Sequence, residues 1–299
     1  MPLPAAERAE IFDNQNLPPP LGEVAEQSEV GGGVLPVKDT PPVSFADSPL
    51  QEGAKGCDDH CENLWECENM IKYLFLDLDD TILDFKKAEA IAIRKTMAAY
   101  GLEPTDERAA RYSEVNDRHW KALERGELSR DQVVTNRFAV FFGEQGVDVD
   151  APAVAKTYES FLSQGHFFLP GAEKAVKEEL FGKYKLYLAS NGTAVVQKGR
   201  MTSADLYPYF EKSFVSQELG HNKPSLEYFQ AAFALIPDFD PAECLMVGDS
   251  LTSDILGGKR AGLRTVWVNP HHKTAPEELK PDYEIEFLAD LPALLEEIE

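Results

Sequence analysis

The residues best suited to chemistry in this sequence are aspartates that follow apolar segments. Asp77 and Asp79 come directly after the run Ile71–Leu76, which we expect to form a buried strand. Alternate residues of an extended strand point to the same side, so both carboxylates can face one reacting centre. Two neighbouring carboxylates repel each other, which tends to hold one proton on the pair. The arrangement predicts an ionised nucleophile and a protonated acid acting on one substrate.

Further polar residues follow two later apolar runs. Ser190 and Asn191 follow the second run, and Asp249 follows the third, with Asp254 five residues later. Ligands in open α/β sheets bind beyond the carboxyl ends of the strands, so we expect these positions to converge on one crevice. A third carboxylate would make that crevice too negative without a cation. Oxygen ligands with room for water suit Mg2+, which would also screen an approaching anion.

Gly192 and Lys223 extend this set toward an anionic ligand such as phosphate. Gly192 lets the backbone approach a ligand closely, and the helix after it offers free N–H groups. Pro224 fits the first position of a helix, so we expect Lys223 at the mouth of the helix that follows. Each signal alone is typical of a turn or a helix cap. Their combination and order at three strand ends are more specific to a catalytic site.

Short apolar runs alternate with amphipathic stretches from Met70 onward, which predicts an α/β fold with a Rossmann-like parallel sheet. The runs expected to be buried strands are Leu74–Leu78, Lys185–Ala189, Leu245–Val247 and Thr265–Val268. The helices expected between them are Ala172–Phe181, Leu226–Leu235 and Ser253–Ala261.

Residues 86–166 interrupt this alternation, because they show helical periodicity without a strand signal. The expected helices are Phe85–Tyr100, Asp106–Arg125, Arg130–Glu144 and Ala151–Ser163. We therefore predict an all-helical cap at 86–166, inserted into an α/β core made of 70–85 and 167–299.

The first 69 residues differ in composition from the rest. They hold nine of the 20 prolines and 14 acidic against three basic side chains. Such a segment buries too little apolar surface to offset its ordering entropy, which predicts a disordered tail. We expect it to be dispensable, or to precede a true start at Met70. Its cluster of metal-ligating side chains lacks a usual zinc spacing, so zinc is the less favoured interpretation; the cluster is Cys57, His60, Cys61 and Cys67.

The overall composition narrows the choice of partners. The 299 residues carry a formal net charge of -23, which disfavours binding to a nucleic acid polymer or an anionic membrane. The sequence shows neither a long apolar run nor a secretory signal, and four cysteines do not suggest a disulfide scaffold. We expect a cytoplasmic protein whose partner is a small-molecule phosphate ester, and the oligomeric state stays open.

These motifs resemble those of the haloacid dehalogenase-like hydrolase superfamily. The segment Asp77–Thr81 matches its first motif, Ser190 the second, Lys223 the third and Gly248–Asp254 the fourth. The resemblance covers Met70 to the C-terminus. It implies that Asp77 attacks phosphorus, and that Asp79 protonates the leaving alcohol and then activates water. The implied phosphoryl-binding residues are Thr81, Ser190, Asn191 and Lys223. The implied Mg2+ ligands are the Asp77 carboxylate, the Asp79 backbone carbonyl and Asp249, with Asp254 in support.

Asp79 also favours phosphate chemistry over dehalogenation, since the true dehalogenases of the superfamily lack this second aspartate. Residues 248–262 and 268–272 look like those of bacterial nucleotidases that hydrolyse pyrimidine nucleoside monophosphates. Phe85 and Trp120 could stack a base, although core packing is the favoured interpretation of both. Asp80 is not needed for the mechanism and is expected to shape the turn.

The predicted function is therefore a Mg2+-dependent 5′-nucleotidase acting through an aspartyl phosphate. A sugar-phosphate or acylneuraminate-phosphate phosphatase shares every core motif and is the alternative enzyme. A binding module without catalysis on the same fold is the alternative of another class.

Overall fold

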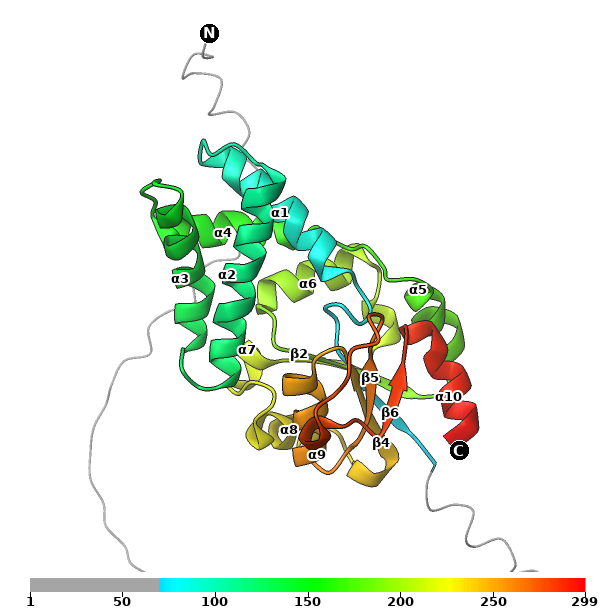
Figure 1. Ribbon diagram of the computed structural model, residues 1–299. Helices are drawn as coiled ribbons and strands as arrows, with labels where there is room; N and C mark the ends of the chain where they lie inside the picture. Colours follow the sequence, from blue (N-terminus) through cyan, green and yellow to red (C-terminus); the bar gives the residue numbers. More distant parts are fainter. Residues whose placement is uncertain (1–69, 299) are drawn as a thin grey trace, which may run out of the picture. The chain divides into compact units, whose positions relative to one another are not determined.

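The structure is a computed structural model that describes residues 70–298 (Figure 1). The predictions for residues 1–69, including the disordered tail and a metal site at Cys57, His60, Cys61 and Cys67, lie outside the described residues. None of the helices within 70–298 combines the length and the apolar character that a bilayer crossing requires.

A six-stranded parallel sheet forms the centre of the fold, with the strand order β3-β2-β1-β4-β5-β6. The strands are β1 (Tyr73–Leu76), β2 (Lys185–Ser190), β3 (Lys212–Val215), β4 (Cys244–Gly248), β5 (Arg264–Val268) and β6 (Tyr283–Ile285). The predicted Rossmann-like α/β class is confirmed, and β1, β2, β4 and β5 correspond to the four expected strands. Strands β3 and β6 at the two edges of the sheet were not predicted, because each is short and only partly buried.

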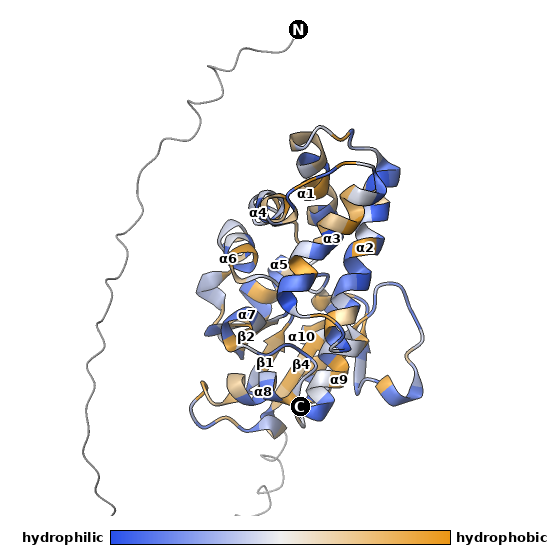
Figure 2. Cartoon of the chain, turned by 90° about the vertical axis from the view of Figure 1, so that its left-hand side faces the viewer, coloured by the Kyte–Doolittle hydropathy of each residue, from blue (hydrophilic) through white to orange (hydrophobic). Residues whose placement is uncertain are grey.

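Both faces of the sheet are covered, which explains why the central strands are continuous apolar runs. Along β1, Leu74 and Leu76 pack into one apolar cluster, whereas Tyr73 and Phe75 pack into a second cluster on the opposite face. The central strands are correspondingly apolar in Figure 2. The covering helices are α5 (Ala172–Lys174), α6 (Ala194–Ser203), α7 (Ser216–Leu219), α8 (Leu226–Phe233), α9 (Leu256–Arg260) and α10 (Leu291–Ile298).

Two of the expected core helices are less regular than predicted. The segment predicted as Ala172–Phe181 contains only the short α5, which continues as a π-helical turn, Ala175–Leu180. The segment predicted as Ser253–Ala261 begins earlier, with a π-helical turn at Leu251–Ile255 that leads into α9. Helix α8 begins at Leu226 and is capped by Ser225, which corrects the prediction that Pro224 occupies its first position.

Four further helices make up the cap, and their bounds agree with the expected ones to within a residue. They are α1 (Phe85–Ala99), α2 (Asp106–Glu124), α3 (Arg130–Glu144) and α4 (Ala151–Leu162). Side-chain caps start three of them: Asp84, Thr105 and Ser129 accept hydrogen bonds from first-turn N–H groups of α1, α2 and α3. The four helices share one apolar cluster, which includes Tyr112, Phe138 and Tyr158. Helices α2 and α3 lie side by side (Figures 1 and 2).

Candidate active site

The loops after β1, β2 and β4 meet at one cavity of about 360 Å³. The parallel register explains the convergence, because Leu76 at the end of β1 lies between Leu188 of β2 and Val247 of β4. The Asp77 N–H also donates to the Val247 carbonyl oxygen over 2.9 Å. The sequence-predicted residues that line the cavity from the core are Asp77, Asp79, Ser190, Asn191, Lys223, Asp249 and Asp254.

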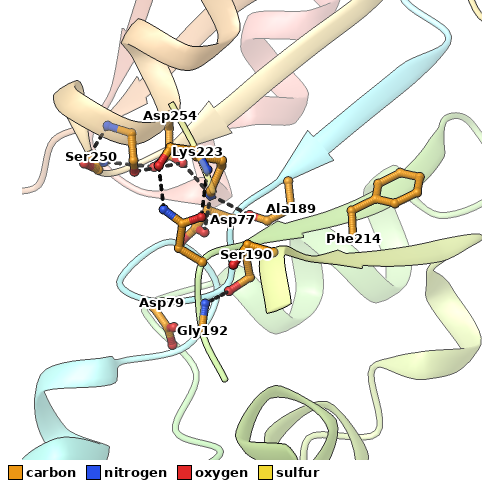
Figure 3. Close-up of polar contacts among 12 residues, drawn as sticks. Asp77, Asp79, Ala189, Ser190, Gly192, Phe214, Lys223, Ser250 and Asp254 are labelled. Atoms are coloured by element: carbon orange, nitrogen blue, oxygen red, sulfur yellow. Dashed lines mark hydrogen bonds and ion pairs between the residues drawn. The ribbon is translucent and has the colours of Figure 1, made fainter. Parts of the chain in front are cut away.

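Lys223 is the central cation of this cluster. Its Nζ lies 2.8 Å from Asp77 Oδ1, 2.6 Å from Asp254 Oδ1 and 2.6 Å from the Ala189 carbonyl oxygen (Figure 3). Burial lowers the pKa of Lys223, but the charges of Asp254 and Asp77 outweigh that effect and raise the pKa overall. An ammonium has three donors, and all three are used here. A direct bond from Lys223 to phosphate would therefore replace one of these partners.

Three carboxylates form a group that could hold a metal ion. Asp77, Asp249 and Asp254 each offer an oxygen, and these oxygens lie within 4.8 Å of one another. Burial, reinforced by the charges of Asp254 and Asp77, raises the pKa of Asp249 well above its ordinary value. The cluster thus holds more negative charge than Lys223 neutralises. An all-oxygen donor set with excess negative charge fits a hard divalent cation such as Mg2+.

The Asp79 carboxylate points away from this metal-ligand group and toward helix α6. Its Oδ2 accepts a 2.7 Å hydrogen bond from Gln197 Nε2, and its Oδ1 forms an ion pair with Arg200. Figure 3 accordingly shows Asp79 apart from the Asp77–Lys223–Asp254 cluster. Arg200 is fully buried and also donates from Nε to the Gly165 carbonyl oxygen. The sequence analysis missed Gln197 and Arg200, because α6 was not recognised as a helix that faces the first motif.

The residues predicted to bind phosphate take three different positions. Ser190 Oγ lines the cavity and accepts hydrogen bonds from Gly192 N and Gln197 Nε2. Asn191 also lines the cavity, but its amide bonds the backbone N–H and carbonyl of Lys223 at 2.9 Å each, so it joins two loops. Thr81 does not line the cavity. Its hydroxyl is buried without a hydrogen-bond partner among the described residues, so the geometry gives no support to its predicted role.

Asp80 behaves as the sequence analysis expected, as a residue that shapes the turn. It adopts φ 56°, and its Oδ1 accepts hydrogen bonds from the N–H groups of Phe85 and Lys86 at 2.8 and 3.3 Å. These bonds connect the loop after β1 to the first turn of α1. The turn therefore orients the start of the cap relative to the core carboxylates.

The cap supplies the other wall of the cavity. Both aromatic candidates, Phe85 and Trp120, line it, together with Asn116 and Arg137. Trp120 Nε1 donates to Asn116 Oδ1 over 3.0 Å, which fixes the indole ring at the cavity wall. Arg137 was not identified from the sequence, because an arginine in an amphipathic helix ordinarily faces solvent.

Arg130, at the start of α3, connects the cap to two core loops. Its guanidinium donates to the carbonyl oxygens of Asn191 at 2.9 Å and Gly192 at 3.2 Å. It also donates to Asn222 Oδ1 at 2.6 Å and to Ser216 Oγ. These contacts join the cap to the loop after β2 and to the segment that carries Lys223. Arg130 therefore holds the cap against the side of the cavity that Asn191 and Lys223 line.

A sequence model of the haloacid dehalogenase-like hydrolase family matches residues 71–262. The chain belongs to the haloacid dehalogenase-like hydrolases. Its fold, with a parallel core sheet and a helical cap, is the one that this assignment implied, and the chain is accordingly a hydrolase.

One similar protein is YfnB of Bacillus subtilis, which is described as a HAD-hydrolase. It is 39% identical over 222 residues, which cover 74% of this chain and 94% of YfnB. A magnesium-bound crystal structure of YfnB, for which interdomain movement is described, matches with a TM-score of 0.72 at 38% identity. That match covers 76% of this chain and 99% of YfnB.

Two relatives carry the name pyrimidine 5′-nucleotidase. PynA of Streptococcus pneumoniae is 35% identical over 220 residues, which cover 74% of this chain and 93% of PynA. YjjG of Escherichia coli is 29% identical over 223 residues, which cover 75% of this chain and 97% of YjjG.

Proposed function

We propose that this hydrolase is a Mg2+-dependent phosphatase that releases phosphate from pyrimidine nucleoside monophosphates through an aspartyl phosphate. The observation that carries the proposal is the buried cluster in which Lys223 lies between Asp77 and Asp254, with Asp249 close enough to share a cation. The likeness to PynA and YjjG supports the nucleotide as substrate.

Asp77 is the proposed nucleophile. Asp77 has one oxygen bonded to Lys223, which orients the carboxylate at the cavity floor. In the first step an Asp77 oxygen bonds to phosphorus while the bond between phosphorus and the nucleoside oxygen breaks. The leaving alkoxide takes a proton, which Asp79 would supply in its protonated form after its carboxyl group leaves Arg200 and Gln197 and turns toward the leaving oxygen. Lys223 stays beside Asp77 and offsets the charge that builds up during the transfer.

Hydrolysis of the intermediate returns the enzyme to its starting state. Asp79 then takes a proton from water, the water oxygen bonds to phosphorus, and the bond to Asp77 breaks. Asp77, Asp249 and Asp254 would hold Mg2+. The ion would neutralise the phosphoryl oxygens as charge shifts onto them. Arg130 keeps the cap closed and limits bulk water at the intermediate.

An assay panel tests the proposal. The purified chain is incubated with Mg2+ and UMP, dUMP, dTMP, sugar phosphates or an acylneuraminate phosphate, and released phosphate is measured. We expect the highest kcat/KM with pyrimidine nucleotides. Turnover of sugar phosphates alone would contradict the nucleotidase part and leave the phosphatase part standing. An inactive protein across the whole panel would favour a binding module.

A further inference from the structure

The cap contains a buried arginine that the chemistry at Asp77 does not use. Arg137 on α3 is 3% exposed, and its only side-chain hydrogen bond within residues 70–298 runs from Nη1 to Asn116 Oδ1 at 2.6 Å. Its Nε has no hydrogen-bond partner within residues 70–298, and no carboxylate of that part of the chain forms an ion pair with it. A guanidinium stays charged. A buried charge without full compensation is costly, so a partner from outside the protein would stabilise it.

Three aromatic rings surround the guanidinium of Arg137. Its guanidinium carbon lies 4.9 Å from the ring centre of Phe138, 5.2 Å from Tyr158 and 5.9 Å from Trp120. These rings hold the cation by cation–π attraction and exclude water from it. A ligand group that enters here therefore meets aromatic faces and a fixed donor.

Asn116 restricts which ligand group fits. Its Oδ1 already accepts hydrogen bonds from Trp120 Nε1 and Arg137 Nη1, and its Nδ2 donates to Glu89 Oε1 at 2.7 Å. Both lone pairs of Oδ1 are thus in use. The cluster offers a donor, the Arg137 guanidinium, rather than a free acceptor. The matching ligand group is a hydrogen-bond acceptor.

This cluster and the core carboxylates line the same cavity. Arg137, Asn116 and Trp120 belong to its cap wall, and Asp77 and Asp79 belong to its core wall. A phosphate ester whose phosphorus lies at Asp77 extends its organic group toward the cap. The volume of about 360 Å³ lies in the range of small-molecule sites.

We propose that Arg137 donates a hydrogen bond to the O2 carbonyl of a pyrimidine base whose ring lies against Trp120. The inference rests on the proposed function and adds the residue that selects the base. O2 is an acceptor that uracil, thymine and cytosine share, so one donor recognises the whole class. Arg137 does not distinguish uracil from cytosine through this bond, since these bases differ at N3 and C4 and both carry O2.

The test compares substrates with and without the base in variants of Arg137. Values of kcat/KM are measured with Mg2+ for UMP, CMP and ribose 5-phosphate in the wild type, Arg137→Met and Arg137→Lys. We expect Arg137→Met to lower kcat/KM for UMP and CMP alike by roughly 10- to 100-fold, the range for a lost charge-assisted hydrogen bond. The loss for ribose 5-phosphate is expected to be at most about threefold. Arg137→Lys keeps the charge and is expected to fall between the two.

Arg118→Met is the matched control, because Arg118 is exposed on α2 of the same cap and does not line the cavity. Its ratio of UMP to ribose 5-phosphate activity is expected to equal that of the wild type. If circular dichroism shows that Arg137→Met does not fold, the test uses Arg137→Lys instead, with the same ratio of kcat/KM for UMP to kcat/KM for ribose 5-phosphate.

Two outcomes would overturn the inference while leaving the nucleotidase intact. One is an equal loss for UMP and ribose 5-phosphate, which would mean that Arg137 only supports the cap. The other is a loss confined to UMP or to CMP, which would place the contact at N3 or C4, where these bases differ. A wild type that hydrolyses ribose 5-phosphate but neither nucleotide would overturn both the proposed function and this inference.

Discussion

The Lys223 ammonium donates to Asp77 Oδ1 over 2.8 Å, and only 1% of the lysine side chain is exposed. The same nitrogen binds Asp254 Oδ1 at 2.6 Å. The lysine therefore belongs to a buried charge cluster, in which it has two effects. It orients the carboxylate proposed as nucleophile, and it offsets part of the charge that makes that carboxylate expensive to bury.

Replacing the proposed nucleophile should stop turnover. Asp77→Asn keeps the size of the side chain and an oxygen for Lys223, so we expect a folded protein. The amide cannot form the acyl phosphate, and kcat should fall by at least about 10³-fold. Phosphate release from UMP measures the effect, and Asp148→Asn, an exposed position, is the control. Substantial turnover in Asp77→Asn would rule out the covalent mechanism.

Removing the lysine should cost stability as well as activity. Lys223→Met leaves Asp77 and Asp254 buried without their shared cation, which is expected to lower the free energy of unfolding by about 3–5 kcal/mol. Urea unfolding followed by circular dichroism measures it. Adding Asp254→Asn to Lys223→Met should recover part of the loss, because it removes one unpaired charge. The exposed Lys183→Met is the matched control, and a similar loss there would contradict the explanation.

The group formed by the carboxylates of Asp77, Asp249 and Asp254 predicts that Mg2+ stabilises the folded state. An ion that binds only the folded protein raises the free energy of unfolding as its concentration rises, by about 2.7 kcal/mol at 100 times the dissociation constant, and the unfolding midpoint rises with it. We expect the midpoint to rise with MgCl2 and to return on adding EDTA. Asp249→Asn should abolish the rise, whereas Asp148→Asn should preserve it. A midpoint that responds equally to MgCl2 and to NaCl of matched ionic strength would argue against a specific site.

The contacts of Arg130 predict that cap closure depends on this residue. Arg130→Met removes donors from two core carbonyls and from Asn222, so the cap should open more often. Two or more lost hydrogen bonds should lower kcat/KM roughly 10-fold or more. Hydrogen exchange should become faster at the start of α3 and in the loop after β2. Unchanged exchange in both segments would show that the closed cap does not need Arg130.

The buried Glu89 of the cap predicts that the free energy of unfolding depends on pH. Burial raises its pKa, although Ser113 and Asn116 donate hydrogen bonds to the carboxylate. An acid whose folded-state pKa is raised contributes stability that is complete below its unfolded pKa and is lost as the pH rises through the folded pKa. The wild type should lose this contribution between acidic and neutral pH.

Glu89→Gln removes that titration, because the amide stays neutral and can still bond Ser113 and Asn116. The variant should therefore gain stability relative to the wild type as the pH rises from about 4.5 to 8. Urea unfolding at several pH values measures the difference. A difference that is constant, or that shrinks with rising pH, would contradict the assignment to Glu89.

The local pattern of residues was enough to predict much of the molecule. Apolar runs that end in Asp77, Ser190 and Asp249 predicted three neighbouring strands, because side-chain burial and strand period are local properties. The cap helices were predictable for the same reason, and their bounds agree with the expected ones to within a residue. Edge strands β3 and β6 were missed, since a half-exposed strand of three or four residues has little apolar signal.

What only the tertiary structure decided is which side chains face one another across the cavity. Nothing near Asp79 in the sequence points to Arg200, which lies 121 residues away, and nothing near Trp120 shows that Arg137 faces the cavity rather than solvent. Thr81 likewise matched a motif, yet its hydroxyl is buried away from the cavity. Strand period and helix period follow from the backbone of each segment. Contacts between distant segments depend on how those segments pack against one another, because packing determines which side chains are buried together.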